Sequence, residues 1–209
     1  MSAGWRRVGR ARLGLLVLLA ALAPLAAGCS SAPPATRSTL ELRHERDADE
    51  AFRMGRYGIA ARRYDRAVAL ARAQDDRRGV GRLLLRQGIA LSALGRCPLA
   101  LPRLRESEAI RRQLGDAAGT RRVHLALGRC LADTGDQVAA AKMLTAAAAG
   151  ASGCVRVEAL AGLGALQARA GDRAAARRQY AAAAAVPCKA PAATALLAYN
   201  RGRLAQRDG

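Results

Sequence analysis

From Leu40 to Gln206, apolar and small residues recur every three or four positions, with no run that alternates between apolar and polar residues. The first spacing is typical of helices that bury one face, whereas a half-buried strand needs strict alternation. Within this region one pattern of glycine, alanine and bulky residues returns four times. The pattern predicts an all-α chain built from repeated helical pairs.

The four copies begin 40, 40 and 36 residues apart, at Gly55, Gly95, Gly135 and Gly171. Each glycine follows a small residue by seven positions (Ala48, Gly88, Gly128 and Gly164) and precedes a bulky one by nine (Tyr64, Leu104, Leu144 and Tyr180). We expect the glycine to end the first helix of a pair, and Asp136 and Asp172 to cap the second helix. The small residues let the two helices touch, and the bulky residue is expected to fill the gap to the next pair.

This arrangement resembles the tetratricopeptide repeat, a helix–turn–helix unit. The resemblance implies a right-handed α-solenoid of about four repeats over residues 40–209, with a capping helix at the C-terminal end. The spacing of 40 exceeds the usual 34 and implies longer helices. The aromatic residue that the family has at the fourth position of the first helix is replaced by His44, Leu84, His124 and Leu160.

Residues 1–28 are predicted to be a lipoprotein signal peptide, which directs export. Four arginines precede an apolar run, Leu13 to Ala27, which is too short for a comfortable transmembrane helix of about 20 residues. The run ends in Leu25-Ala26-Ala27-Gly28-Cys29, which resembles the lipobox of bacterial lipoproteins. The resemblance implies cleavage before Cys29 and covalent diacylglycerol and fatty acyl groups, such as palmitate, on that residue; no other cofactor is expected. The alternative is an ordinary secretory signal that is cut near Ala27.

Residues 29–39 are predicted to be the lipidated cysteine and a flexible linker rich in Ser, Thr and Pro. Ser30, rather than Asp, follows the cysteine, which by family analogy favours the periplasmic face of the outer membrane over the inner membrane. The expected location is therefore the bacterial cell envelope, where the protein is attached to the membrane by its lipid anchor.

The net charge of +19 first points to nucleic acid, because 33 of the 35 basic residues are arginine. Export argues against that function, and the processed chain from residue 29 keeps a charge of +15. Hydrophobic residues make up 51 % of the chain but aromatic residues only 3 %, as expected for a core of small helical contacts. Nucleic-acid binding is the alternative function only if residues 1–28 are not an export signal.

Four cysteines follow Cys29 and allow three disulfide pairings in an oxidising compartment. The repeat register places Cys97 and Cys130 at one end of neighbouring units and Cys154 and Cys188 at the opposite end. These two pairings are therefore predicted. Free thiols or a zinc site are the alternatives, although no Cys-x-x-Cys spacing supports a metal.

The resemblance implies a groove along the first helices of the repeats. Its predicted lining residues combine arginines with an aliphatic floor: Arg82, Leu85, Arg86, Ile89, Arg122, Leu125, Arg129, Tyr199, Asn200 and Arg203. Arginine forks suit carboxylates and phosphates, so the expected partner is an acidic or C-terminal peptide segment of an envelope protein. The alternative is that these arginines are ordinary solvated charges.

The sequence carries no catalytic motif: no phosphate loop, His-Glu-x-x-His or Gly-x-Ser-x-Gly is present. His44 and His124 are expected to pack between helices, so we predict neither an enzyme nor a metal site. The expected function is that of a membrane-anchored adaptor or scaffold for envelope assembly, secretion or pilus-type machinery. A protein that binds anionic peptidoglycan or lipopolysaccharide through its arginines is the second hypothesis. The oligomeric state is not predicted.

Overall fold

The computed structural model describes residues 37–206, which form nine α-helices and no strand. The helices are α2 (Thr39–Arg53), α3 (Tyr57–Ala73), α4 (Arg77–Ala93), α5 (Cys97–Gln113), α6 (Ala117–Asp133), α7 (Gln137–Ala148), α8 (Gly153–Arg169), α9 (Arg173–Ala184) and α10 (Pro191–Ala205). This confirms the all-α prediction. Within the described part of the chain, no helix is both long and apolar enough to cross a membrane.

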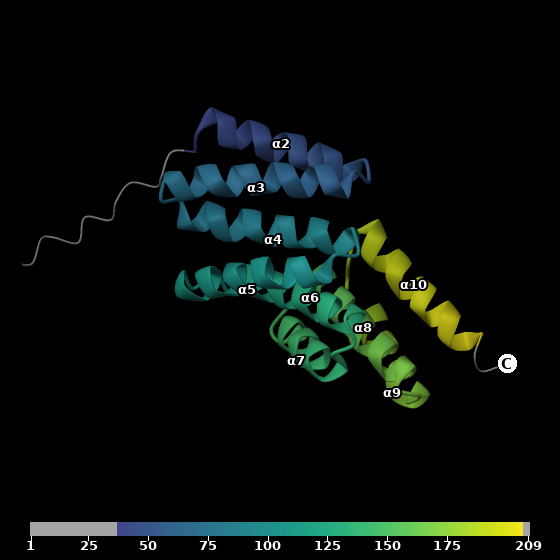
Figure 1. The fold of residues 1–209 in the computed structure, drawn as a ribbon. Coiled ribbons are helices and arrows are strands. Elements are labelled where there is room, and N and C mark those ends of the chain that lie inside the picture. Colours follow the sequence, from purple (N-terminus) through teal and green to yellow (C-terminus); the bar gives the residue numbers. More distant parts are fainter. Residues whose placement is uncertain (1–36, 207–209) are drawn as a thin grey trace, which may run out of the picture. The chain divides into compact units, whose positions relative to one another are not determined.

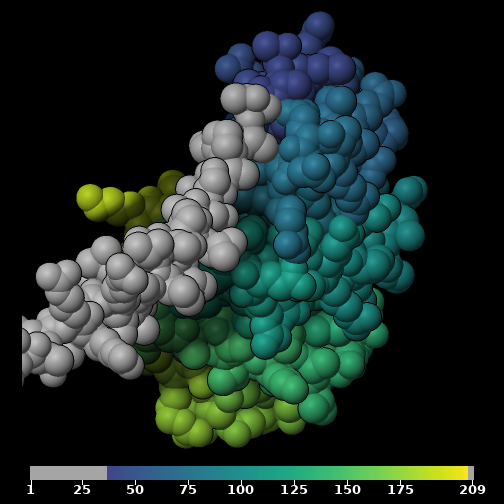
Figure 2. All heavy atoms as spheres, turned by 90° about the vertical axis from the view of Figure 1, so that its left-hand side faces the viewer, coloured from purple at the N-terminus to yellow at the C-terminus, as the bar shows by residue number. Residues whose placement is uncertain are grey.

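The helices pack in chain order as four antiparallel hairpins: α2 with α3, α4 with α5, α6 with α7, and α8 with α9 (Figure 1). The second helix of each hairpin also packs on the first helix of the next, and α10 packs on α8 and α9. Figure 2 follows the same order in space-filling form, through successive bands of colour. The four predicted repeats and the additional C-terminal helix are therefore confirmed.

The turns inside the hairpins have the chemistry that the sequence predicts. Gly135 and Gly171 adopt left-handed backbone angles, with φ of 93° and 87°, which glycine accepts at little cost. The next residue caps the following helix: Asp136 Oδ1 accepts a hydrogen bond from Ala139 N at 3.0 Å, and Asp172 Oδ1 accepts one from Ala175 N at 2.8 Å. Each of these turns therefore ends one helix and starts the next within three residues.

Inside each hairpin the bulky residue lies against the small residue of the first helix. A Cβ atom added to Gly128 would stand 2.7 Å from Leu144 Cγ, and one added to Gly164 would stand 2.5 Å from Tyr180 Cε1. Leu144 also reaches the next hairpin, where a Cβ on Gly162 would lie 3.0 Å away. The bulky residue therefore packs against the first helix of its own hairpin. The predicted packing against the next hairpin is an additional contact, which Leu144 makes with α8.

The folded part begins before the predicted boundary at residue 40. Ser38 caps α2, since its Oγ accepts a hydrogen bond from Glu41 N at 3.1 Å, and its own N–H donates to Gln74 Oε1 at 2.9 Å. Arg37 Nε forms an ion pair with Glu41 at 2.9 Å. Residues 37–39, predicted as linker, therefore belong to the helical unit, because α2 needs a cap. The predicted signal, Cys29 and the rest of the linker lie outside the described residues.

Candidate peptide-binding face

The ten residues predicted to line a groove lie on the first helices of the hairpins and on α10. Arg82, Leu85, Arg86 and Ile89 are in α4, Arg122, Leu125 and Arg129 are in α6, and Tyr199, Asn200 and Arg203 are in α10. They have three different environments: the helical core, an ion-pair network, and a surface that includes a pocket at the C-terminal end.

Leu85 and Leu125 belong to the core. Both are buried and share one apolar cluster with residues of α5, α6, α7 and α8. The prediction that they form the floor of an open groove is wrong, because the close packing of successive hairpins covers them. Ile89 is exposed instead, and it lines a pocket of about 340 Å³ together with Phe52, Arg53 and Tyr64.

Arg82 reaches across from α4 to two buried carboxylates of α2. Its Nη1 donates to Glu45, and its Nη2 lies 3.8 Å from Glu41 Oε1. Arg37 approaches the same two carboxylates from the start of α2. Glu41 and Glu45 are among the few buried charged residues, and a buried carboxylate without a partner is costly. Arg82 therefore holds the first two hairpins together.

Arg86 extends this network by one helical turn. Its Nη1 lies 2.5 Å from Asp49 Oδ2 and 3.4 Å from Glu45, and Tyr64 donates a hydrogen bond to Asp49 at 2.5 Å. Burial alone would raise the pKa of Asp49, but the hydrogen bonds from Arg86 and Tyr64 outweigh it, so the pKa lies below its ordinary value. Arg82 and Arg86 therefore already bind carboxylates of their own chain.

The acidic partners of these arginines were missed by the sequence reasoning. Glu41, Glu45 and Asp49 follow one another at intervals of four, which places them on one face of α2. The arginines are also four apart, and the pairs Glu45–Arg82 and Asp49–Arg86 are both 37 positions apart, close to one repeat. This matching charge pattern is the signal that could have identified the network. We call these five residues and Arg37 the α2–α4 ion ladder.

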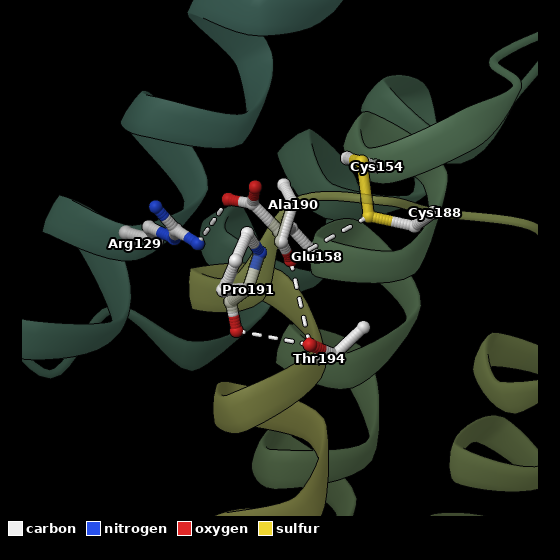
Figure 3. The surroundings of a disulfide bond; sticks show 7 residues. All are labelled: Arg129, Cys154, Glu158, Cys188, Ala190, Pro191 and Thr194. Atoms are coloured by element: carbon white, nitrogen blue, oxygen red, sulfur yellow. Dashed lines mark hydrogen bonds and ion pairs between the residues drawn. A yellow bond between two sulfur atoms is a disulfide. The ribbon is translucent and has the colours of Figure 1, made fainter.

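The arginines of α6 have other surroundings. Arg122 occupies the position of Arg82 one repeat later and is exposed, because α4 carries Gly81 and Leu85 where α2 carries Glu41 and Glu45. Arg129 forms an ion pair of 2.5 Å with Glu158 of α8 (Figure 3). Of the two, only Arg122 has no ion pair with an acidic residue in the described part of the chain.

A small pocket of about 70 Å³ lies where α10 meets α8 and α9. Its lining combines three small or polar residues with two arginines and two larger side chains: Ala165, Ala168, Asn200, Arg169, Arg203, Tyr180 and Leu204. We call it the C-terminal pocket. Asn200 and Arg203 were predicted as groove residues, and this pocket brings them together. Tyr199 lies outside it, exposed, with the Arg203 guanidinium 5.8 Å from its ring centre.

The electrostatics of the C-terminal pocket favour an anion. Burial raises the pKa of Tyr180, while the positive charges of Arg169 and Arg203 act in the opposite direction, so both cations lie near this phenol. Arg169 makes a 3.5 Å contact from Nη1 to the Ala132 carbonyl. Neither arginine has an ion pair with an acidic residue of the described chain, in contrast to Arg82 and Arg86. The C-terminal pocket therefore brings together two arginines whose charges are available to bind an anionic ligand.

Two disulfides brace the array, and both join the predicted partners. Cys97 at the start of α5 is bonded to Cys130 of α6, with 5.2 Å between the Cα atoms. Cys154 at the start of α8 is bonded to Cys188, between α9 and α10, with a Cα separation of 4.8 Å. Figure 3 shows the second bond beside the start of α10, where Thr194 Oγ1 donates to the Pro191 carbonyl at 2.9 Å. This bond fixes the point at which the chain enters α10, and so helps to position the C-terminal pocket.

The two histidines contact neighbouring helices, as the sequence predicts. His124 Nε2 is 3.0 Å from Glu108 of α5, and His44 Nδ1 is 3.4 Å from Arg63 of α3. Within residues 37–206, no group of three His, Cys, Asp or Glu side chains is arranged to hold a metal ion.

Comparison with known proteins supports the repeat assignment. Residues 48–113, from the middle of α2 to the end of α5, match the family model described as tetratricopeptide repeat. The first two hairpins are therefore similar to tetratricopeptide repeats over this segment. No curated protein sequence matches the chain. The solved structure of the apo form of RapI is similar in fold to this helical array, with a TM-score of 0.60 and 14 % sequence identity. The similarity covers 69 % of this chain and 41 % of the RapI chain, so this chain spans less than half of that protein. At this low identity the similarity concerns the fold alone.

Proposed function

We propose that this protein is a lipid-anchored scaffold of the bacterial cell envelope that binds an acidic segment of a partner protein. Tetratricopeptide repeats generally serve as protein-interaction scaffolds, and the structure contains four such hairpins. The observation that carries the envelope part of the proposal is Leu25-Ala26-Ala27-Gly28-Cys29, which ends an apolar run directly before a short linker. A repeat scaffold that follows a lipobox would be tethered to a membrane while its helices stay in water.

The anchor would consist of acyl chains on Cys29. One chain gives marginal binding, and each buried methylene adds about 0.8 kcal/mol, so diacylglycerol with a third acyl group gives stable attachment. Ser30 after the cysteine supports the outer membrane as the destination. Eight residues separate Cys29 from Ser38, the cap of α2.

The C-terminal pocket is the site we propose for the acidic segment. Arg169 and Arg203 stand there with Asn200, and guanidinium groups form paired hydrogen bonds with carboxylates. The other predicted arginines on the face are less suitable: Arg82 and Arg86 are committed to the α2–α4 ion ladder. The pocket is small, so it would take one carboxylate group, with the rest of the segment lying along the neighbouring surface.

Binding to anionic cell-wall polymers or lipopolysaccharide is the second candidate function. Residues 37–206 carry 30 basic and 15 acidic side chains, an excess that attracts anionic surfaces over a distance set by the salt concentration. Such binding would be spread over the surface. It would therefore weaken steadily with salt and change little when two arginines of the pocket are replaced.

The anchor is tested by following the full-length protein in its native host. The wild-type chain should be recovered in the envelope fraction, and an inhibitor of the lipoprotein signal peptidase should cause the unprocessed form to accumulate. Cys29→Ala should abolish incorporation of labelled fatty acid. Cys188→Ala is the matched control and should leave labelling unchanged. Recovery of an uncleaved chain in the cytosol without inhibitor would overturn the envelope proposal and favour nucleic acid.

A further inference from the structure

Exposed apolar side chains gather at the turns inside the first two hairpins. Met54 and Ile59 flank the α2–α3 turn and are 57 % and 40 % exposed, while Leu94 and Leu99 flank the α4–α5 turn and are 40 % and 54 % exposed. Both turns lie at the same end of their hairpins (Figure 1). Large apolar residues that are exposed together, rather than singly, indicate an interaction surface.

The two turns repeat the same sequence pattern. Met54-Gly55-Arg56 is followed by Ile59, and Leu94-Gly95-Arg96 is followed by Leu99. Each turn therefore presents two apolar side chains with an exposed arginine between them. The turns are also neighbours, since a Cβ atom on Gly58 would lie 3.9 Å from Leu94 Cδ2. We call the four apolar residues with Arg56 and Arg96 the turn patch.

The turn patch ends at the second hairpin. The next turn of the same kind, between α6 and α7, carries the exposed acids Asp133 and Asp136. The opposite end of the first hairpins carries acids as well, among them Asp75, Asp76 and Asp116. Single exposed apolar residues also occur elsewhere, at Leu114 and Val138, but the turn patch combines four of them with two arginines and has no acidic residue within either turn.

We propose that the turn patch inserts into the headgroup region of an anionic lipid membrane. The four apolar side chains would enter the boundary between headgroups and acyl chains, and the two arginines would bind lipid phosphates. Arginines near such a surface are attracted by the negative charge of its headgroups. The inference rests on the proposed lipid anchor, which would keep the array beside the membrane. It adds a second contact that orients the array.

The length of chain before α2 permits this contact. α2 has 15 residues, so the turn patch lies about 22 Å from the start of the helix. The residues from Cys29 to Ser38 span up to about 35 Å when extended. An anchor on Cys29 can therefore lie in the same membrane surface as the turn patch. The tether would also hold the patch near the surface, which raises its effective concentration.

Fluorescence of an introduced tryptophan tests this contact in the full lipidated protein. Leu99→Trp places the probe in the turn patch, and Leu114→Trp places it at the other end of α5, where Leu114 is also exposed. Trp5, the only natural tryptophan, precedes the proposed cleavage site. Each variant is reconstituted into vesicles of phosphatidylcholine with or without phosphatidylglycerol, and quenching by brominated lipid is measured after flotation confirms attachment.

We expect several-fold stronger quenching for Leu99→Trp than for Leu114→Trp, and only in vesicles that contain phosphatidylglycerol. Adding Arg56→Glu and Arg96→Glu should reduce the quenching of Leu99→Trp to the level of Leu114→Trp. Attached protein with equal quenching for both probes would overturn this inference and leave the anchor standing, whereas failure to float would overturn the anchor itself. A lipid-independent blue shift of Leu99→Trp without quenching would show that a second copy of the chain covers the patch, and would overturn the membrane contact.

Discussion

Arg86 of α4 donates to both carboxylate oxygens of Asp49 of α2, joining the first helices of two successive hairpins. Glu45 lies 3.4 Å from the same guanidinium nitrogen, and Arg82 binds Glu45 one turn earlier. Two of the five arginines that the sequence offers as ligand-binding groups, Arg82 and Arg86, are thus stabilising contacts of the fold. This relationship separates the arginines that hold the array together from those that are free to bind a partner.

Arg82→Ala should destabilise the protein by about 2 kcal/mol, because it leaves the buried carboxylates of Glu41 and Glu45 with fewer partners. Arg122→Ala, at the same position one repeat later, should change stability by less than about 0.5 kcal/mol, since Arg122 is exposed. Chemical denaturation of both variants gives the two free energies of unfolding. Equal effects would contradict the structural role assigned to Arg82.

The Asp49 contact should give stability a defined pH dependence. The pKa of Asp49 is lowered in the folded protein. The ionised Asp49 carboxylate therefore contributes fully to the free energy of unfolding when the pH is above the ordinary pKa of 3.8, and this contribution is lost as the pH falls below that value. Near neutral pH, Asp49→Asn should cost about 1 kcal/mol, a modest figure because the carboxylate is partly exposed and screened. The difference from wild type should shrink as the pH falls below 3.8. Tyr64→Phe, which removes one donor to Asp49, should give an intermediate dependence, and a pH-independent difference for Asp49→Asn would oppose the assignment.

Gly88→Ala tests the close helix contact inside a hairpin. The added methyl group would overlap the Leu104 side chain, which should destabilise the protein by about 1–3 kcal/mol. Gly202→Ala is the control in α10, where a Cβ atom meets nothing within 4 Å, and it should stabilise the protein by about 0.5–1 kcal/mol. Thermal and denaturant unfolding measure both changes. If Gly88→Ala were as stable as wild type, the assigned packing would be incorrect.

Replacing Cys154 and Cys188 together by serine should cost about 3–4 kcal/mol in the loop-entropy model, since the bond closes a loop of 34 residues. The loss should disappear when wild type and variant are compared under reducing conditions. Peptide mapping without reduction should recover Cys97 linked to Cys130 and Cys154 linked to Cys188. Four alkylatable thiols in the exported protein would contradict both bonds.

Much of this fold is predictable because its determinants are local. Gly135 and Asp136 end one helix and cap the next with atoms a few residues apart, and Gly128 with Leu144 marks a helix pair within a single repeat. The disulfide partners follow from the same register. Local signals and one repeat length were sufficient for each of these predictions.

The candidate site was less predictable because burial and pairing depend on neighbouring repeats. Leu85 and Leu125 occupy surface positions of an isolated helix pair and become buried when the next hairpin packs on them. Arg82 and Arg86 have partners about one repeat away, on α2 of the preceding hairpin. Only the assembled array distinguishes these arginines from Arg169 and Arg203.

Capture of a partner from solubilised envelopes tests the central claim most directly. The wild-type protein is compared with the double variant Arg169→Glu, Arg203→Glu and with Arg82→Ala and Arg122→Glu, after each is shown to be folded by its helical circular dichroism. The account predicts that wild type, Arg82→Ala and Arg122→Glu retain the same envelope protein, and that the double variant loses it. Equal capture by the double variant, or salt-sensitive binding to cell wall with no protein captured, would contradict a protein scaffold that uses the C-terminal pocket.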